Sequence, residues 1–538
     1  MKSRFISLLL IGLPLISLTS CDSSSVKIHE REIQYLNDNY DSYYQIFPYS
    51  FADSNGDGVG DLKGIIDKFD YIKSLNYTGL WLTPIHQSPS YHKYDVIDYK
   101  SIDSKFGSLD DYDELVKLCH DNNMKIILDL VINHSSDKNP WFEKCYAAHL
   151  RNQKDNQYYS YYNFVDLSSS DATPTGYTRL TPSLAYESRF NSGMPDLNLE
   201  EVLTNPNGYL ANDIKDILKF WLIDHNIDGF RLDAVTSYFT GYVDENVKFL
   251  TWLNQEAKKL KENCFIVAEG SWGNNNENYK YTESGINGCF QFDDARADGY
   301  IARAINQMDA SYLSFAIKKN NECVPENNKN AMAMPFITNH DLGRVVGCVS
   351  GRGHSENVKL ANGILMLLNG STFSYYGDEI GMAVVSQTGE TSKDEDKRQP
   401  LNWGDKYTCK PVLGSTKAED KEKYPFGSIK QQNKDKNSIL NYIKKANLIR
   451  LQNPEIARGE VEDIYISNDD SFSVISKTYN GKTIYIALNC SKKKNQEFDY
   501  SKYGNIEVVA SLTTSSNLKK GKKENSLIIP PMGIAILA

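Results

Sequence analysis

The sequence of 538 residues lacks several features that would indicate other classes of protein. Its net charge of −10 is spread along the chain, and no basic tract indicates nucleic-acid binding. The nine cysteines include no CxxC pair, which excludes an obvious zinc site or a dense disulfide framework. After the N-terminal segment, no apolar run looks long enough to span a membrane. The remaining possibility is a globular protein with room for one large domain and smaller modules.

The N-terminus is a targeting segment rather than part of the fold. A positively charged start precedes an apolar stretch, residues 5–18, that is too short for an ordinary transmembrane helix. The stretch ends in Leu18-Thr19-Ser20-Cys21, which resembles the bacterial lipoprotein signal, in which cleavage leaves the cysteine N-terminal and lipid-modified. A plain secretory signal with an incidental cysteine is the alternative. We therefore expect an exported bacterial lipoprotein, with signal peptide 1–20 and tether 21–34, anchored to a membrane through Cys21 at the cell surface or facing the periplasm.

The rest of the chain alternates strand-like apolar runs with helical patterns, which is typical of an α/β fold with a parallel sheet. The expected strands are 43–47, 79–83, 125–130, 229–233, 266–269, 287–292, 336–341 and 371–376. Asn, Ser, Tyr and Pro replace the helical periodicity over 135–205, and because a structureless loop of that length is uncommon, we expect a small inserted domain there. Short alternating runs over 458–538 predict a C-terminal antiparallel β-domain. The large domain would then comprise 35–134 and 206–457.

Four of the expected strands carry acidic or histidine residues at or just after their ends. An unpaired buried carboxylate is costly, so such strand ends indicate a cleft where several strands deliver acids to one place. Parallel barrels build active sites in this way, at the C-terminal ends of their strands. The four segments are Asp129-Leu-Val-Ile-Asn-His134, Gly229-Phe-Arg-Leu-Asp233, Ile266-Val-Ala-Glu269 and Phe336-Ile-Thr-Asn-His-Asp341.

These segments, in this order, resemble the signature regions of the α-amylase family of glycoside hydrolases. Met194-Pro-Asp-Leu-Asn198 resembles a fifth signature, in a form intermediate between the oligo-1,6-glucosidase and neopullulanase subfamilies. The resemblance covers essentially the whole chain after the tether. It implies a (β/α)8 TIM barrel with a small domain inserted after the third strand and a C-terminal antiparallel β-sandwich.

The resemblance also implies catalytic roles. Glycoside hydrolysis with retention needs one carboxylate to attack the anomeric carbon and one acid to protonate the leaving oxygen. Asp233 is implied as the nucleophile, Glu269 as the general acid/base, and Asp341 as a third carboxylate that binds sugar hydroxyls and helps to distort the ring. Arg231 precedes Asp233 by two residues and so shares its strand face, where its positive charge should keep Asp233 ionised.

Further residues are implied to bind the substrate. Tyr94 resembles an aromatic that stacks on the sugar at the cleavage site, although a packing role is the alternative. Asp95 is expected to support the site through Arg344, with a structural ion pair as the alternative, and Asp129 to orient the acids. The implied substrate-binding residues are Tyr94, Asp95, His134, Arg231, His340 and Arg344.

The segment Asp53-Ser-Asn-Gly-Asp-Gly-Val-Gly-Asp61 is a candidate metal-binding loop. Oxygen ligands at alternate positions, with glycine for a sharp turn, suit a hard cation such as Ca²⁺. An EF-hand is excluded because its twelfth position, which needs a glutamate, is Gly64. The resemblance implies Ca²⁺, or Mg²⁺ in the same loop, in a structural role; a metal-free Asx-turn is the alternative. The implied ligands are Asp53, Asn55, Asp57, the Val59 carbonyl and Asp61.

Departures from the family pattern bear on specificity. Thr236 and Ser237 stand where many α-amylases have a Lys-His pair that contacts a leaving-group sugar and helps to bind a second calcium. Ala234 follows the implied nucleophile, where 1,6-specific relatives typically carry valine, and this favours α-1,4 cleavage. We therefore expect hydrolysis of starch, maltodextrin or related α-glucans. The alternatives are an exo-acting α-glucosidase, an oligo-1,6-glucosidase, a glucanotransferase, or a non-catalytic glucan-binding surface protein, which the retained acids disfavour.

Overall fold

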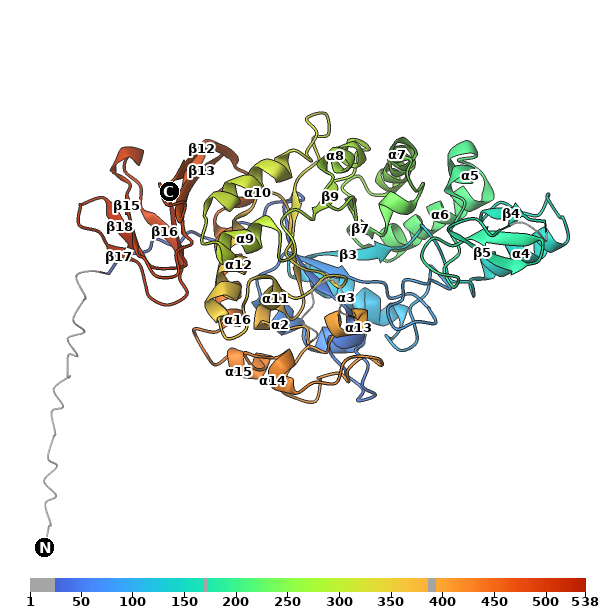
Figure 1. Cartoon of the computed structure of the whole chain (residues 1–538), viewed down its shortest axis with the longest axis horizontal. Helices are drawn as coiled ribbons and strands as arrows, with labels where there is room; N and C mark the ends of the chain where they lie inside the picture. The colour runs from blue at the N-terminus through green and yellow to red at the C-terminus, as the bar shows by residue number, and fades with distance from the viewer. Residues whose placement is uncertain (1–24, 169–171, 386–392) are drawn as a thin grey trace, which may run out of the picture.

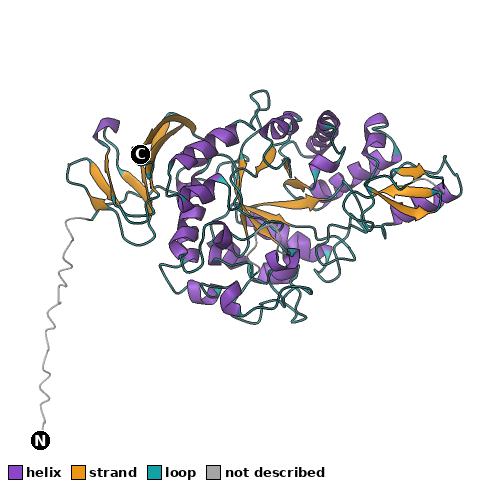
Figure 2. Ribbon diagram, in the orientation of Figure 1, coloured by secondary structure: helices purple, strands orange, loops and turns teal. Residues whose placement is uncertain are grey.

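The computed structural model describes residues 25–168, 172–385 and 393–538 and arranges them in three parts (Figure 1). A barrel occupies the centre, a small α/β domain projects from one side, and a β-domain packs on the other (Figure 2). No helix among these residues is long and apolar enough to cross a membrane. Cys21 and the expected signal peptide lie outside the described residues.

The central part is a barrel of eight parallel strands. Neighbouring strands pair in parallel in the order β10-β9-β8-β7-β3-β2-β1-β11. A parallel bridge between Phe336 and Phe373 joins the two ends of this sheet. The predicted barrel is therefore confirmed, although its seventh strand, Met334–Pro335, precedes the expected range 336–341, which contributes only the bridge at Phe336. The strands are β1 (Ser42–Ile46), β2 (Gly79–Leu82), β3 (Lys125–Leu130), β7 (Gly229–Leu232), β8 (Phe265–Ala268), β9 (Gly288–Gln291), β10 (Met334–Pro335) and β11 (Thr372–Tyr375).

Alternate residues of the strands face two different cores. Strand side chains alternate between the two faces of a sheet. In β8, Phe265 and Val267 belong to the cluster that fills the barrel, whereas Ile266 and Ala268 belong to the cluster between strands and helices. Residues buried on both faces explain why these strands read as continuous apolar runs rather than as alternating ones.

The helices of this region show local sequence signals for their ends. In α3 (Leu109–Asp121), Ser108 and Asp111 form a capping box. α7 (Val243–Leu260) has acids in its first turn and lysines in its last, which complements the helix dipole. The others are α1 (Leu62–Asp67), α2 (Phe69–Ser74), α5 (Leu199–Thr204), α6 (Tyr209–Lys219), α8 (Asn275–Glu283), α9 (Tyr300–Asn306), α10 (Ser311–Asn321), α11 (Val345–Cys348), α12 (Ser355–Leu367), α13 (Asp394–Lys397), α14 (Asp420–Lys423), α15 (Ile429–Gln432), α16 (Ile439–Gln452) and α17 (Glu455–Arg458).

The small projecting domain lies between β3 and β7 in the chain. It contains α4 (Pro140–Leu150) and an antiparallel sheet in the order β4 (Phe164–Asp166), β6 (Leu184–Glu187) and β5 (Tyr177–Thr181). Its last segment returns to the barrel, where His134 and Asp196 form an antiparallel bridge and the Leu197 amide donates to the Asn133 carbonyl at 2.9 Å. The domain therefore reaches the C-terminal end of β3, where the acidic segments begin.

The C-terminal part consists of two antiparallel sheets with an apolar cluster between them. The buried Lys477 ammonium donates to the carbonyls of Leu367 and Ile456, at 2.7 and 2.8 Å, and so joins this part to α12 and α17. The five-stranded sheet comprises β12 (Glu460–Ile466), β13 (Phe472–Tyr479), β14 (Lys482–Asn489), β19 (Gly533–Leu537) and β16 (Val508–Leu512), and the three-stranded sheet β15 (Gln496–Asp499), β18 (Ser526–Ile529) and β17 (Lys519–Lys520).

The cysteines outside the targeting segment contribute no cross-links. All eight in the described part of the chain are free and buried. Cys264 and Cys289, which flank or lie in barrel strands, are buried thiols as their apolar surroundings predict.

Candidate active site

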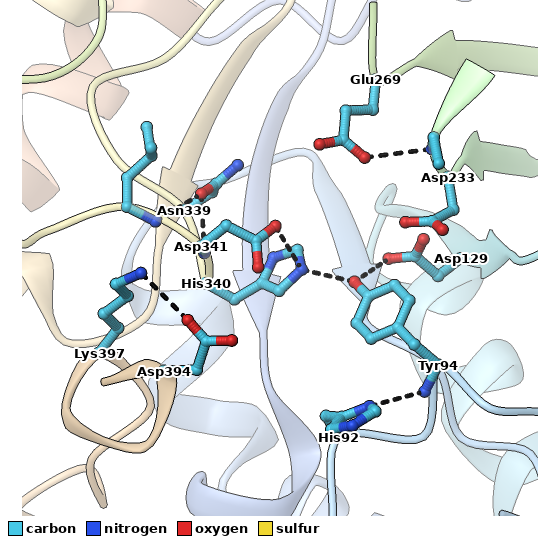
Figure 3. Close-up of polar contacts among 12 residues, drawn as sticks. His92, Tyr94, Asp129, Asp233, Glu269, Asn339, His340, Asp341, Asp394 and Lys397 are labelled. Carbon is cyan, nitrogen blue, oxygen red and sulfur yellow. Dashed lines mark hydrogen bonds and ion pairs between the residues drawn. The ribbon is translucent and has the colours of Figure 1, made fainter. Parts of the chain in front are cut away.

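The strand pattern itself brings the predicted acids together. Phe265 and Val267 point into the barrel, and the same alternation points Glu269 into its C-terminal mouth. In β7 the alternation directs Arg231 and then Asp233 to the same mouth. Because β3, β7 and β8 are consecutive neighbours in the sheet, their C-terminal ends meet at one place. Figure 3 shows the carboxyl groups of Asp233, Glu269 and Asp341 directed towards a common space.

One arginine connects three of the acids. The Arg231 guanidinium is fully buried and donates through Nη1 to Asp129 and to Asp233, both at 2.6 Å. Its Nη2 donates to Glu269 Oε2 at 2.8 Å. The Ala234 amide also donates to that oxygen, at 3.1 Å. The implied nucleophile and the implied acid/base are therefore held on two nitrogens of one rigid planar group, which fixes their relative positions.

Burial raises the pKa of two of the three carboxyl groups around Arg231. Burial, together with the charges of Asp233 and Asp341, raises the pKa of Glu269 to about 7 despite the opposing effect of Arg231. Burial likewise raises the pKa of Asp129 to about 7. A carboxyl group with such a pKa holds its proton near neutral pH, as a general acid must.

Asp341 has the opposite electrostatic environment. Burial opposes its ionised form, but the neighbouring His340, Arg398 and Arg231 outweigh burial and lower the pKa of Asp341 to about 2. Arg398 makes the closest contact, donating to Asp341 Oδ1 at 2.9 Å and to the His340 carbonyl at 3.1 Å. The site therefore combines an anionic Asp341 with Glu269, whose raised pKa lets it carry a proton, and the negative charge can stabilise a cationic sugar.

Sequence reasoning missed Arg398. The residue lies 57 positions after Asp341 in the chain and comes from the segment that follows α13. It also donates to the Tyr91 hydroxyl at 3.1 Å. No predicted strand end or signature region contains it, so only the tertiary structure identifies it as the arginine on Asp341.

His340 and Tyr94 link the two sides of the site. Gln45 donates to His340 Nδ1 at 2.8 Å, which leaves Nε2 as the nitrogen that carries the hydrogen. Nε2 lies 2.6 Å from the Tyr94 hydroxyl and 3.0 Å from Asp341 Oδ2 (Figure 3). The Tyr94 hydroxyl donates in turn to Asp129 at 3.2 Å. The Tyr94 ring lies nearly parallel to the His340 ring, with centroids 5.4 Å apart and an interplanar angle of 6°.

His134 is at the site, next to the inserted domain. Its side chain is buried, its Nε2 atom has no protein hydrogen-bond partner, and burial lowers its pKa. The ring centroid lies 5.0 Å from that of Phe190, which belongs to the inserted domain and is half exposed. Asn133 Nδ2 donates to His134 Nδ1 at 3.3 Å, so Nε2 carries the hydrogen and can donate it to an oxygen such as that of a sugar hydroxyl.

The expected link between Asp95 and Arg344 is wrong. Asp95 accepts hydrogen bonds from the Ser88 and Ser90 hydroxyls. Arg344 instead pairs with Asp378 at 3.5 Å, donates to the Tyr376 carbonyl, and stacks on the Tyr375 ring with a centroid distance of 4.0 Å. The loop after Asp341 turns Arg344 towards the end of β11, where the buried Asp378 offers a closer countercharge.

Ala234, directly after Asp233, has an unusual backbone. Its φ of 51° and ψ of 40° lie in the left-handed region, which non-glycine residues adopt rarely. A β-branched residue is disfavoured most strongly in this region. The conformation lets the Ala234 amide donate to Glu269 Oε2. Backbone strain therefore helps to orient the predicted acid.

The loop from Asp53 to Asp61 folds its side-chain oxygens onto its own amides. Asp53 accepts from the Gly56 and Gly58 amides at 2.6 and 2.7 Å, Asn55 from Asp57, and Asp57 from Val59. No group of three or more His, Cys, Asp or Glu side chains in the described ranges is arranged to hold a metal ion. The oxygen atoms of the loop are ligands of the type that a hard cation prefers. A cation bound there would need amide and carbonyl oxygens as ligands in addition to the carboxylates.

Comparison with known proteins gives consistent matches along most of the chain. Residues 45–459 match the family model described as "Alpha amylase, catalytic domain". Alpha-amylase 3 of Dictyoglomus thermophilum is 35% identical over 468 residues, which cover 84% of this chain and 85% of that protein. An oligo-1,6-glucosidase of Bacillus cereus is 28% identical over 563 residues, covering 90% of this chain and 96% of that protein. Among solved structures, Eubacterium rectale Amy13B superposes with a TM-score of 0.84 at 35% identity, covering 94% of this chain and 97% of that chain.

Proposed function

The chain belongs to the α-amylase family of glycoside hydrolases, and we propose that it cleaves α-1,4-glucosidic bonds in starch, maltodextrins or related α-glucans with retention of configuration. The observation that carries the proposal is the placement of Asp233 and Glu269 on two nitrogens of Arg231. This arrangement holds the proposed nucleophile and the proposed acid side by side, which retaining cleavage requires.

The proposed reaction follows from these residues. Asp233, held by Arg231, attacks the anomeric carbon, and Glu269 transfers its proton to the departing glycosidic oxygen. Water then enters, Glu269 removes its proton, and the bond to Asp233 is hydrolysed. Asp341 remains negatively charged because His340, Arg398 and Arg231 lower its pKa, and this charge stabilises the positive charge that develops on the sugar in both steps.

Two observations support the preference for α-1,4 over α-1,6 glucosidic bonds. Ala234 in place of valine favours α-1,4 bonds, and the similarity to alpha-amylase 3 of Dictyoglomus thermophilum supports the same assignment. The alternative is exo-acting α-glucosidase, oligo-1,6-glucosidase or glucanotransferase activity, which the similarity to the Bacillus cereus oligo-1,6-glucosidase supports. The non-catalytic alternative is disfavoured because the acids lie together with the charges that catalysis requires.

Products formed from amylose distinguish these activities. We expect a ladder of maltooligosaccharides early in the reaction, because an enzyme that cleaves internal α-1,4 bonds produces fragments of many lengths. Chromatography of the first products is the measurement, with maltotriose and isomaltotriose as paired substrates. Glucose as the sole early product would favour the exo-acting alternative, and faster cleavage of isomaltotriose would contradict the α-1,4 assignment.

We further propose that the loop from Asp53 to Asp61 binds Ca²⁺ through Asp53, Asn55, Asp57, the Val59 carbonyl and Asp61. A ligand that binds only the folded state stabilises it, by about 2.7 kcal/mol at a free concentration of 100 Kd. Chelation with EGTA should therefore lower the melting temperature, and added Ca²⁺ should restore it. Asp57→Ala should abolish this response, whereas Asp70→Ala, which removes an exposed acid of α2, should retain it. A calcium-free protein, verified by metal analysis, that melts at the same temperature with and without Ca²⁺ would contradict the proposal.

The sequence also supports a location. We propose that Cys21 is lipid-modified and anchors the enzyme to a membrane, at the cell surface or facing the periplasm. Several acyl chains anchor a protein firmly, whereas one chain gives only marginal affinity. Cys21→Ser should abolish labelling by a fatty-acid probe and remove the protein from washed membranes, while Ser23→Ala should leave both unchanged. Wild-type activity found mostly in cell-free medium, with an unmodified Cys21, would overturn this assignment.

A further inference from the structure

We propose that a lysine-rich surface of the C-terminal β-domain docks on the anionic phospholipid headgroups of the membrane to which the lipid on Cys21 attaches the enzyme. The inference rests on the proposed lipid modification and is independent of the hydrolytic reaction. The contact orients the enzyme on the membrane. The surface, called the lysine patch below, is formed by Lys27, Lys519, Lys520 and Lys522.

Most of the expected tether, residues 21–34, lies against the folded protein. Ser25 forms an antiparallel bridge with Lys519 of β17. The side chains of Val26 and Ile28 pack on the apolar cluster between the two sheets of the C-terminal part. The chain is therefore fixed to the C-terminal β-domain from Ser25 onwards, next to the lysine patch.

The short distance from Cys21 to Ser25 brings this surface to the membrane. An extended chain covers about 3.5 Å per residue, so the four steps between these residues span at most about 14 Å. A free tether of residues 21–34 would instead span about 45 Å. Since charges are screened over about 8 Å at physiological ionic strength, only groups close to the headgroups interact with them strongly. The lysine patch is within that reach when Cys21 is acylated.

The charge of this surface is opposite to that of the whole chain. Residues 491–526 contain eight lysines and four acidic residues, whereas the whole chain carries −10. The four lysines of the patch are exposed. In the part of the chain that the structure describes, none of them forms an ion pair, whereas the neighbouring Lys523 pairs with Asp499 at 2.7 Å. The exposed acids Glu497 and Glu524 reduce this positive charge without cancelling it.

An anionic membrane therefore favours one orientation of the molecule. It attracts the lysine patch and repels the more acidic remainder of the chain. Figure 1 shows the C-terminal β-domain at one end of the molecule and the inserted domain at the other. With the patch on the headgroups, the inserted domain and the mouth of the barrel beside it point away from the membrane. Long glucan chains then reach the cleft from the aqueous side.

The test measures how fast individual lysines are acetylated by an uncharged reagent, N-acetoxysuccinimide. The lipid-modified protein, purified from membranes, is inserted into preformed vesicles of phosphatidylcholine alone or of equal parts phosphatidylcholine and phosphatidylglycerol. Mass spectrometry of peptides gives the rate at each lysine. Lys144 and Lys154, exposed lysines of the inserted domain, are the controls within the same molecule.

We expect acetylation of the lysine patch to be at least about fivefold slower in the anionic vesicles than in the neutral ones, because the headgroups cover these ammonium groups. The rates at Lys144 and Lys154 should differ by less than about twofold, since these residues lie far from the contact. Salt at about 1 M, which shortens the screening length to about 3 Å, should remove most of the protection.

A charge-reversed variant tests whether the patch itself makes the contact, with Lys27 as the reporter. In Lys519→Glu/Lys520→Glu/Lys522→Glu, the rate at Lys27 in anionic vesicles should rise to within about twofold of the rate in neutral vesicles. In the matched control Lys138→Glu/Lys144→Glu/Lys154→Glu, which changes the net charge equally, Lys27 should stay protected. Melting temperatures and turnover of maltoheptaose show whether each variant is folded.

Equal rates in the two kinds of vesicle, or continued protection of Lys27 in the variant of the patch, would overturn the inference. Protection by soluble polyphosphate with none by anionic vesicles would assign the patch to a soluble polyanion, and would overturn it as well. Mass spectrometry of the N-terminal peptide separates these results from a failure of the proposed location. An acylated Cys21 without protection would refute this inference alone, whereas an unmodified Cys21 would refute the location and this inference with it.

Discussion

Replacing Asp233 with asparagine is expected to reduce hydrolysis of maltoheptaose by about 10⁴-fold or more, because the attacking carboxylate is lost. The amide oxygen of asparagine can still accept a hydrogen bond from Arg231, which contacts Asp233 at 2.6 Å in the wild type. The variant should therefore fold, and calorimetry and steady-state kinetics check both statements. In the wild type, the first product seen by NMR should be the α-anomer, since two successive inversions retain configuration.

Asp244→Asn is the matched control for this experiment. Asp244 is 80% exposed and forms a surface ion pair with Lys280, at 3.1 Å, so the same chemical change there should leave turnover unchanged. Appreciable turnover by Asp233→Asn, or the β-anomer as the first product of the wild type, would refute the assignment of Asp233 as a nucleophile. An unfolded variant would be replaced by Asp233→Glu, which keeps the charge but misplaces it.

Replacing Glu269 with glutamine is expected to lower kcat/KM on maltoheptaose by about 10²- to 10⁴-fold, the usual contribution of a general acid. The loss should be much smaller on α-maltosyl fluoride, because fluoride departs without a proton. Wild-type kcat/KM on maltoheptaose should fall as the pH rises through about 7, because the pKa of Glu269 is raised to about 7 and the acid loses its proton above that value. Glutamine does not ionise, so the variant should lose this alkaline decline.

Glu245→Gln is the control, since Glu245 lies on the surface and forms an ion pair with Lys248 at 2.8 Å. The pH profile separates catalysis from positioning. A residue that only orients Arg231 would affect the fluoride and the oligosaccharide alike. Equal losses on both substrates, or an alkaline decline that persists in Glu269→Gln, would assign the proton transfer to another group.

Asp129 supports the cluster around Arg231 without being exposed to a substrate. Asp129 accepts from Arg231, from Trp81 Nε1 at 3.1 Å and from the Tyr94 hydroxyl, and it is inaccessible to solvent. It therefore serves to hold Arg231 and Tyr94 in place rather than to touch a substrate. With one guanidinium shared among three carboxyl groups, removal of Arg231 would leave buried charges unpaired.

The sequence by itself determined the barrel and the identity of its acids. Strand periodicity is local, so an apolar run such as Phe265–Ala268 indicates a strand, and period-two alternation indicates that Glu269 faces the same way as Val267. Parallel strands place their C-terminal ends at one rim, so acids at those ends must meet. The strands, the direction of Glu269 and the meeting of the strand ends thus follow from local patterns and from parallel strand pairing alone.

Only the tertiary structure decided the contacts made by irregular segments. Arg398 reaches Asp341 from a segment 57 residues away, whereas Arg344, close to Asp341 in the chain, turns to Asp378. Neither contact could be predicted from the periodicity of a strand or helix. The path of a loop depends on tertiary packing and on which charged groups are buried near it. The protonation of Glu269 was decided in the same way: its raised pKa reflects burial and the competition for Arg231, and these exist only once the strands have assembled.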